Sequence, residues 1–143
     1  YYTLFRKGIS MSGHNILQQL SREPELLIED PGANGVIPID RNFGICNVVS
    51  TSASNGGKRI LANPAREGIV ITVNFQTKDT NNLEITGSVS DTTELATKIG
   101  SIDGTQTVKM TCAHAGDTVS FISTKLGADL IWNVFANNGG ALS

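Results

Sequence analysis

The chain has 143 residues and a formal net charge of −2, from 11 basic and 13 acidic side chains. This length suits one domain with a core of its own, and the near-neutral charge argues against general attraction to the phosphate backbone of a nucleic acid. Charged residues make up only 17% of the chain and glycine occurs 15 times, which favours short strands joined by turns over long surface helices.

The first 34 residues differ in sequence pattern from the rest of the chain. In "SGHNILQQLSREPELLIED", Ser12 can cap a short helix that carries Ile16 and Leu20 on one face, and Pro24 disfavours its continuation. A strong turn signal, "DPGANG", follows. The opening "YYTLFRKGIS" lacks the apolar stretch of a secretory signal. We therefore expect residues 1–34 to form an arm that contains a short helix.

The arm needs a surface against which to fold. An isolated helix of this length is marginal in water, so its apolar face must pack either on a neighbouring protein or back on its own domain. The predicted partner-binding anchors of the arm are Leu4, Phe5, Ile16, Leu20, Leu26, Leu27 and Ile28. Several anchors are needed because ordering a flexible segment costs entropy.

From residue 35 onward the pattern predicts a β domain. The predicted strands are residues 36–39, 43–50, 59–62, 68–75, 83–89, 107–112, 118–123 and 130–135, separated by turns such as "SNGG", "KDTNN" and "KLGAD". Short strands at fairly even spacing favour an all-β, jelly-roll-like sandwich or barrel over residues 35–143. One helical insertion is predicted over residues 91–99, because Asp91 and Glu94 have capping-box spacing.

The clearest alternation lies in "VKMTCAHAGDTVSFI", residues 108–122. In extended geometry Met110 and Cys112 share the core face, as do Val119 and Phe121 after the corner. In that corner, Gly116 supplies freedom for positive φ and Asp117 can bind backbone amides.

The segment "DLIWNVF" has apolar residues on both faces, so we expect this strand to be covered on both sides. The longest apolar run is only strand-sized, which gives no membrane helix. Cys46 and Cys112 read as small core residues, with a single bridge between them as the alternative.

No residue cluster predicts a metal site or a cofactor. Cys112 and His114 lie two apart on an extended chain, but only Cys46 and His14 add further soft ligands, and the paired short spacings of zinc sites are absent. "DTNN" and "SIDG" supply oxygen atoms without the spaced acidic residues of a calcium loop. "SNGGKR" resembles a phosphate cradle, but it departs from the full pattern, and a hairpin turn is the better interpretation.

Catalytic residues are not predicted either. The nucleophile elbow G-x-S-x-G does not occur, and Ser12 with His14 would lie on an arm rather than on a rigid scaffold. Glu84, Asp91 and Glu94 could supply paired carboxylates, but any surface carries such residues. We therefore expect a protein that binds another protein and is not an enzyme.

The segment "GTQTVKMTCAHAGDTVSFISTKLGADLIWNVFANNGG" resembles a theme of tailed-phage capsid decoration, or cement, proteins. In that β-rich, jelly-roll-like family a strand ends in a small-residue turn, and a glycine and an aromatic-bearing strand follow. The matching positions here are Val108, Met110, Ala113, Ala115, Gly116, Val119 and Phe121, while the proline of the family theme is missing.

The resemblance implies a homotrimer on the outer surface of a virion, which clamps adjacent subunits of the major capsid protein. Amino-terminal arms in the family often reach across neighbouring subunits, a role that the predicted arm would fit. The alternative is a carbohydrate-binding or receptor-binding β-sandwich of the adhesin type. The single tryptophan, Trp132, alternates into a predicted core strand, which leaves that alternative without an obvious stacking platform.

Overall fold

The computed structural model describes residues 26–87, 99–100, 106–107 and 109–143. The short helix predicted in the arm lies outside these residues, and so does the predicted insertion up to residue 98. Ile99, the last residue of that predicted helix, instead begins a two-residue strand. Within the described residues every regular element is a strand, so the predicted all-β class is confirmed.

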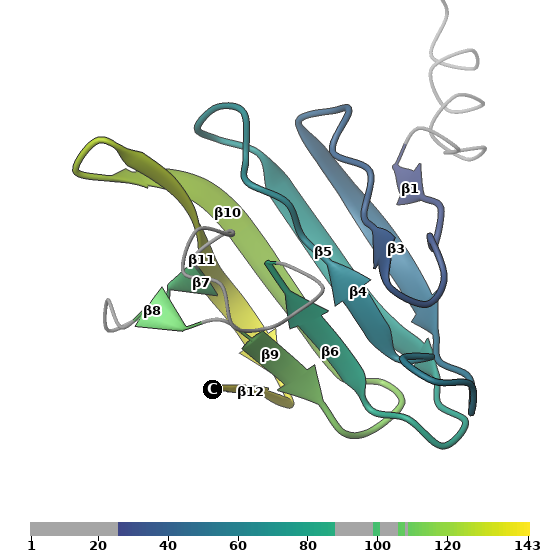
Figure 1. Cartoon of the computed structure of the whole chain (residues 1–143). Coiled ribbons are helices and arrows are strands. Elements are labelled where there is room, and N and C mark those ends of the chain that lie inside the picture. Colours follow the sequence, from purple (N-terminus) through teal and green to yellow (C-terminus); the bar gives the residue numbers. More distant parts are fainter. Residues whose placement is uncertain (1–25, 88–98, 101–105, 108) are drawn as a thin grey trace, which may run out of the picture.

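The described strands form two mixed sheets (Figure 1). The seven-stranded sheet has the order β1 (Leu27–Ile28), β3 (Phe43–Val49), β5 (Val70–Thr77), β10 (Thr118–Leu126), β11 (Asp129–Asn138), β7 (Ile99–Gly100) and β8 (Gln106–Thr107). The five-stranded sheet has the order β12 (Gly140–Leu142), β9 (Lys109–Cys112), β6 (Leu83–Thr86), β4 (Lys58–Ile60) and β2 (Gly35–Val36).

The two sheets share one hydrophobic core. Cys46, Val73 and Phe121 of the larger sheet belong to the same buried cluster as Ile85 and Met110 of the smaller sheet. Burial alternates along β3 and β5, as expected for strands with one face on the core and one outside. In the described residues the sheets do not close on each other, so the predicted sandwich is confirmed and the predicted barrel is wrong.

The first six strands wind back and forth between the sheets. Strands β1, β3 and β5 lie in the larger sheet and β2, β4 and β6 in the smaller one. Each strand is therefore followed by one in the opposite sheet, and every second strand runs in the same direction. Consequently β1 with β3, β3 with β5, β2 with β4, and β4 with β6 are all parallel pairs. We call this region, residues 27–86, the coil half.

Strands β9 to β12 pair differently, and we call their region, residues 109–142, the antiparallel half. Strands β10 and β11 form a hairpin, while β9 pairs antiparallel with both β6 and β12. The corner at residues 113–117 takes the chain from β9 in one sheet to β10 in the other. Gly116 has φ +99° there, and the Asp117 carboxylate accepts hydrogen bonds from the amides of Ala113 and His114, as predicted.

The turn "SNGG" is not a hairpin turn, so that prediction is wrong. It joins β3 to β4, which lie in different sheets. The turn itself is tight, with the amide of Gly56 donating to the carbonyl of Ala53 at 2.8 Å. Glycine and asparagine suit a tight reversal whether the chain returns beside itself or crosses to the facing sheet.

Most of the predicted core positions are confirmed. Met110, Cys112, Val119 and Phe121 are all fully buried. Along β11, Trp132 packs in the core and its indole N–H donates to the carbonyl of Ala62 at 2.8 Å. On the opposite face of β11, Ile131 is buried but Phe135 is 53% exposed, so the strand is covered on both sides at only one end.

Candidate functional site

The outer face of the larger sheet carries exposed apolar side chains beside its β1 edge. Phe43, Ile45 and Val49 alternate along β3 and are 57%, 39% and 41% exposed, and Leu27 of β1 is aligned with Ile45. We call these four residues the β1–β3 face. Residues opposite one another on paired strands lie within contact range, so Leu27 and Ile45 extend the row sideways. Large apolar side chains that adjoin one another on a surface are typical of an interaction site.

The same outer face becomes polar further along the sheet. Asn74 donates to Asn47 at 3.0 Å, and the hydroxyl of Thr118 donates to Asn74 at 3.2 Å. Thr72 and Ser120 are joined by a hydroxyl–hydroxyl hydrogen bond of 2.8 Å. These cross-strand bonds satisfy the polar side chains within the sheet. The middle of this face is therefore polar, and it separates the β1–β3 face from the exposed Phe135 of β11.

Three of the predicted arm anchors fall on described residues. Leu26 is half-buried and its carbonyl accepts a hydrogen bond of 2.7 Å from the amide of Ile45. Leu27 is 53% exposed, as an anchor should be. Ile28 is buried in the core cluster of its own chain, so its assignment as a partner-binding anchor is corrected: β1 pairing turns alternate side chains inward. Leu4, Phe5, Ile16 and Leu20 lie outside the described residues.

A buried ion pair holds the β1–β2 connection against β4. Arg59 is 1% exposed, and its guanidinium donates to both carboxylate oxygens of Asp30, at 2.6 and 3.2 Å. It also donates to the carbonyls of Gly56, Lys58 and Val49. Those five hydrogen bonds use all five N–H groups of the side chain.

Asp30 is ionised in this arrangement. Burial disfavours its charged form, but the hydrogen bonds from Arg59 and from the amides of Val49 and Gly32, with the charge of Arg59, outweigh burial. The pKa of the Asp30 carboxyl therefore lies below its usual value of 3.8. The pair joins residues 30 and 59, so the carboxyl end of the predicted arm is part of the folded β structure.

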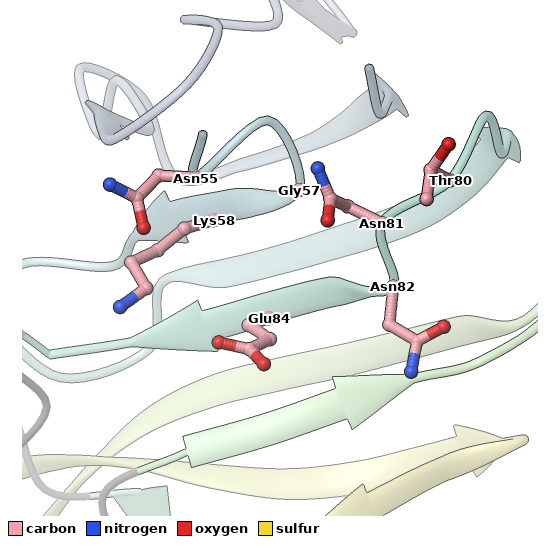
Figure 2. A pocket seen from close by; sticks show the side chains of 7 residues that line it. All are labelled: Asn55, Gly57, Lys58, Thr80, Asn81, Asn82 and Glu84. Carbon is pink, nitrogen blue, oxygen red and sulfur yellow. The ribbon is translucent and has the colours of Figure 1, made fainter. Parts of the chain in front are cut away.

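A polar cleft of about 350 Å³ opens at the end of the coil half (Figure 2). One wall comes from the β3–β4 loop and the start of β4, and the other from the β5–β6 loop and β6. Its lining residues are Asn55, Gly57, Lys58, Thr80, Asn81, Asn82 and Glu84. Figure 2 shows Asn55 and Lys58 on one side of the cleft, Asn82 on the other and Glu84 on the β6 strand between them.

Hydrogen bonds fix the two loops to each other. The Ser50 hydroxyl donates to the carbonyl of Asn81 at 2.8 Å, and the Asn81 amide donates back to the carbonyls of Thr51 and Ala53 at 2.6 and 2.9 Å. The Asp79 carboxylate accepts from the amide of Ser52 at 3.1 Å. The walls of the cleft are therefore set by the fold before any ligand arrives.

Gly57 allows the loops to approach closely enough to form the cleft. A Cβ atom at this position would lie 1.9 Å from the carbonyl oxygen of Asn82, which no side chain could tolerate. The Gly57 carbonyl accepts a hydrogen bond of 2.9 Å from the amide of Glu84. Asn55 adopts φ +58°, a left-handed conformation that asparagine tolerates better than most residues.

Among the described residues, those considered as metal ligands or catalysts do not lie together. Cys112 is fully buried, whereas the side chain of His114 is 85% exposed and lies 3.9 Å from Asp117. Across the described ranges no three His, Cys, Asp or Glu side chains gather as a metal site would require. Glu84 lines the cleft and pairs with Lys109 at 3.9 Å. Ser12, His14, Asp91 and Glu94 lie outside the described residues.

The two cysteines are free and buried, as predicted for core residues, and the alternative of a bridge is wrong. Burial raises the pKa of the Cys46 and Cys112 thiols to about 11, and the negative charges of Asp30 and Asp117, respectively, add to the effect. Both thiols therefore stay protonated at neutral pH, which makes them poor nucleophiles.

Sequence reasoning missed the cleft. Its walls come from "SNGGK" and "DTNNLE", which are some 25 residues apart and were interpreted as two independent turns. The available signal was the concentration of asparagine and glycine in both turns. Only the winding of the coil half places them side by side.

Comparison with protein-family models, curated proteins and solved structures finds no match to this chain. Among the residues that the structure describes, no helix has the length and apolar character needed to cross a membrane.

Proposed function

We propose that this chain is a non-enzymatic capsid decoration protein that binds the major capsid protein on the outer surface of a virion. The proposal includes a homotrimeric, jelly-roll-like form of the β-sandwich, in line with the family resemblance of residues 104–140. The observation that carries it is the exposed β1–β3 face, which adjoins the point where residues 1–25 join the chain.

The position of this face supports attachment to a larger surface. Phe43 and Leu27 are more than half exposed and project from a sheet, so a partner can cover them without any rearrangement of the backbone. A stable interface needs about 800 Å² from each partner. The β1–β3 face alone supplies too few side chains for that area, so the proposal assigns the remainder to residues 1–25 and to neighbouring copies.

The test is sedimentation with shells. Shells are assembled from the major capsid protein encoded in the same genome, and the wild-type chain is expected to sediment with them. Phe43→Asp with Ile45→Asp should lower the affinity by at least tenfold, because a charge on a desolvated apolar contact costs more than about 1.4 kcal/mol. Both side chains are exposed, so the variant should keep the wild-type circular dichroism spectrum.

Val36→Asp is the matched control. Val36 is 52% exposed but lies on β2, at the edge of the other sheet, and this variant should bind shells as the wild type does. Removal of residues 1–25 should also weaken binding while leaving Asp30 paired with Arg59 and the β domain folded. Equal shell occupancy for the face variant and the wild type would exclude the β1–β3 face as the attachment surface. Absence of any wild-type binding would refute the proposed function.

A further inference from the structure

The polar cleft between the β3–β4 and β5–β6 loops is distinct from the β1–β3 face and has its own chemistry. We propose that it binds a neutral saccharide unit through the side-chain amides of Asn55 and Asn82. This inference goes beyond capsid attachment, and it depends on a different set of residues.

The side-chain amides of Asn55 and Asn82 are available to a ligand. Asn55 and Asn82 are exposed at the cleft. Neither side chain has a hydrogen-bond partner within the described part of the chain, whereas the Asn81 amide is occupied by the carbonyls of Thr51 and Ala53. A carboxamide offers both a donor and an acceptor, and a sugar hydroxyl does the same. Two such amides among the residues that line one cleft suit a ligand with several hydroxyl groups.

The cleft fits other classes of ligand poorly. Lys58 and Glu84 are aligned partners on β4 and β6, so the charge of the lining cancels and does not favour a phosphate. Glu84 is the only carboxylate in the lining, too few for a cation such as calcium. No apolar side chain lines the cleft, so a hydrophobic ligand would lose its contacts.

The walls of the cleft are held in place without a ligand. Cross-links from Ser50 and Asn81 hold the loops together, and the close contact at Gly57 fixes their spacing. Preformed walls spare the ligand the cost of ordering the loops. A volume of about 350 Å³ lies at the lower end of the range for small-molecule sites, roughly 300–1,000 Å³. The lining contains no aromatic ring to stack on, so a single sugar should bind weakly, on the order of 1 mM.

The experiment combines a glycan array with nuclear magnetic resonance titration of the ¹⁵N-labelled full chain. The titrants are glucose, galactose, mannose and N-acetylglucosamine, followed by any neutral glycan that the array retains. We expect saturable shifts of the side-chain NH₂ signals of Asn55 and Asn82. The double variant Asn55→Gly with Asn82→Ala should bind at least tenfold more weakly. Glycine tolerates φ +58° at position 55, so this variant removes the amide without straining the loop.

Asn138→Ala is the control, since Asn138 is an exposed asparagine at the end of β11, away from the cleft lining. It should keep wild-type binding. The inference is overturned if no neutral glycan binds, if only charged glycans bind, or if the double variant binds as tightly as the wild type. The double variant should still sediment with capsid shells and the β1–β3 face variant should still bind sugar, so the two proposals fail separately.

Discussion

The coil half and the antiparallel half both bury side chains in the shared core, but their strands are connected differently. In the coil half each strand is followed by one in the opposite sheet, so the parallel pairs join segments that are distant in sequence. In the antiparallel half, the β10–β11 hairpin pairs neighbours through a two-residue connection, Gly127 and Ala128. The coil half carries the buried ion pair, the cleft and the β1–β3 face. The β3–β4 and β5–β6 loops, which cross between the sheets, are hydrogen-bonded to each other at the end of the coil half and form the cleft.

The largest effect should come from the core that the two halves share. Phe75 on β5 and Phe121 on β10 are fully buried in the same cluster. Replacing either with alanine should cost about 3–5 kcal/mol of unfolding free energy. Urea unfolding followed by fluorescence and circular dichroism should give one coincident transition for both variants. Separate transitions for one variant would mean that the halves are independent units.

A large effect confined to the coil half is expected at Arg59. Arg59→Met leaves Asp30 partly buried without its counter-charge and removes five hydrogen bonds. The expected loss is about 3 kcal/mol in urea unfolding. Lys125→Met, at an exposed position in the antiparallel half, should change the stability by less than about 0.5 kcal/mol. Similar losses of stability for both variants would show that the ion pair does not stabilise the coil half.

A smaller, matched effect is expected at one glycine in each half. Gly68 and Gly116 have φ of +86° and +99°, and a Cβ atom at either would meet nothing within 4 Å. Alanine at either position should therefore cost about 1–2 kcal/mol from backbone strain alone. Thermal unfolding of the two variants measures this cost. A neutral result at one site would show that the backbone there can relax.

The smallest effect is a change in acid sensitivity. The folded-state pKa of Asp30 lies below 3.8, so its ionisation contributes stability above that value, and the contribution is lost as the pH falls through the folded pKa. Asp30→Asn lowers stability at neutral pH because Arg59 loses its counter-charge. Between pH 5 and 2, the Asp30→Asn variant should lose less stability than the wild type loses. Urea unfolding at each pH measures this difference. Parallel pH curves for the two proteins would contradict this assignment.

The sequence predicted the long strands better than their connectivity. Strands β3, β5 and β10 were found because a core-facing residue at every second position is visible in residues 43–49, 70–77 and 118–126. The two-residue strand β1 has too few positions to show an alternation, so Leu27 and Ile28 were interpreted as part of an arm. A turn that crosses between sheets and a hairpin turn use the same residues, so "SNGG" could not reveal the coil.

The candidate functional surfaces could also be predicted from the sequence only in part. Leu27 was predicted as a partner-binding residue, and it is exposed. Phe43 and Ile45 were recognised only as strand residues, because alternation gives two faces without saying which one is covered. The cleft and the buried pair of Asp30 and Arg59 depend on segments that are brought together by the winding of the chain. The asparagine and glycine content of the two turns was a local signal for the cleft, but no local pattern predicted the ion pair.

The most direct test of the central claim is electron cryomicroscopy of particles assembled with this chain. The account predicts density for the β-sandwich on the outer surface of the shell, with Phe43 and Ile45 covered by the major capsid protein. Particles without this density, or with the β1–β3 face turned towards solvent and away from every neighbour, would contradict it.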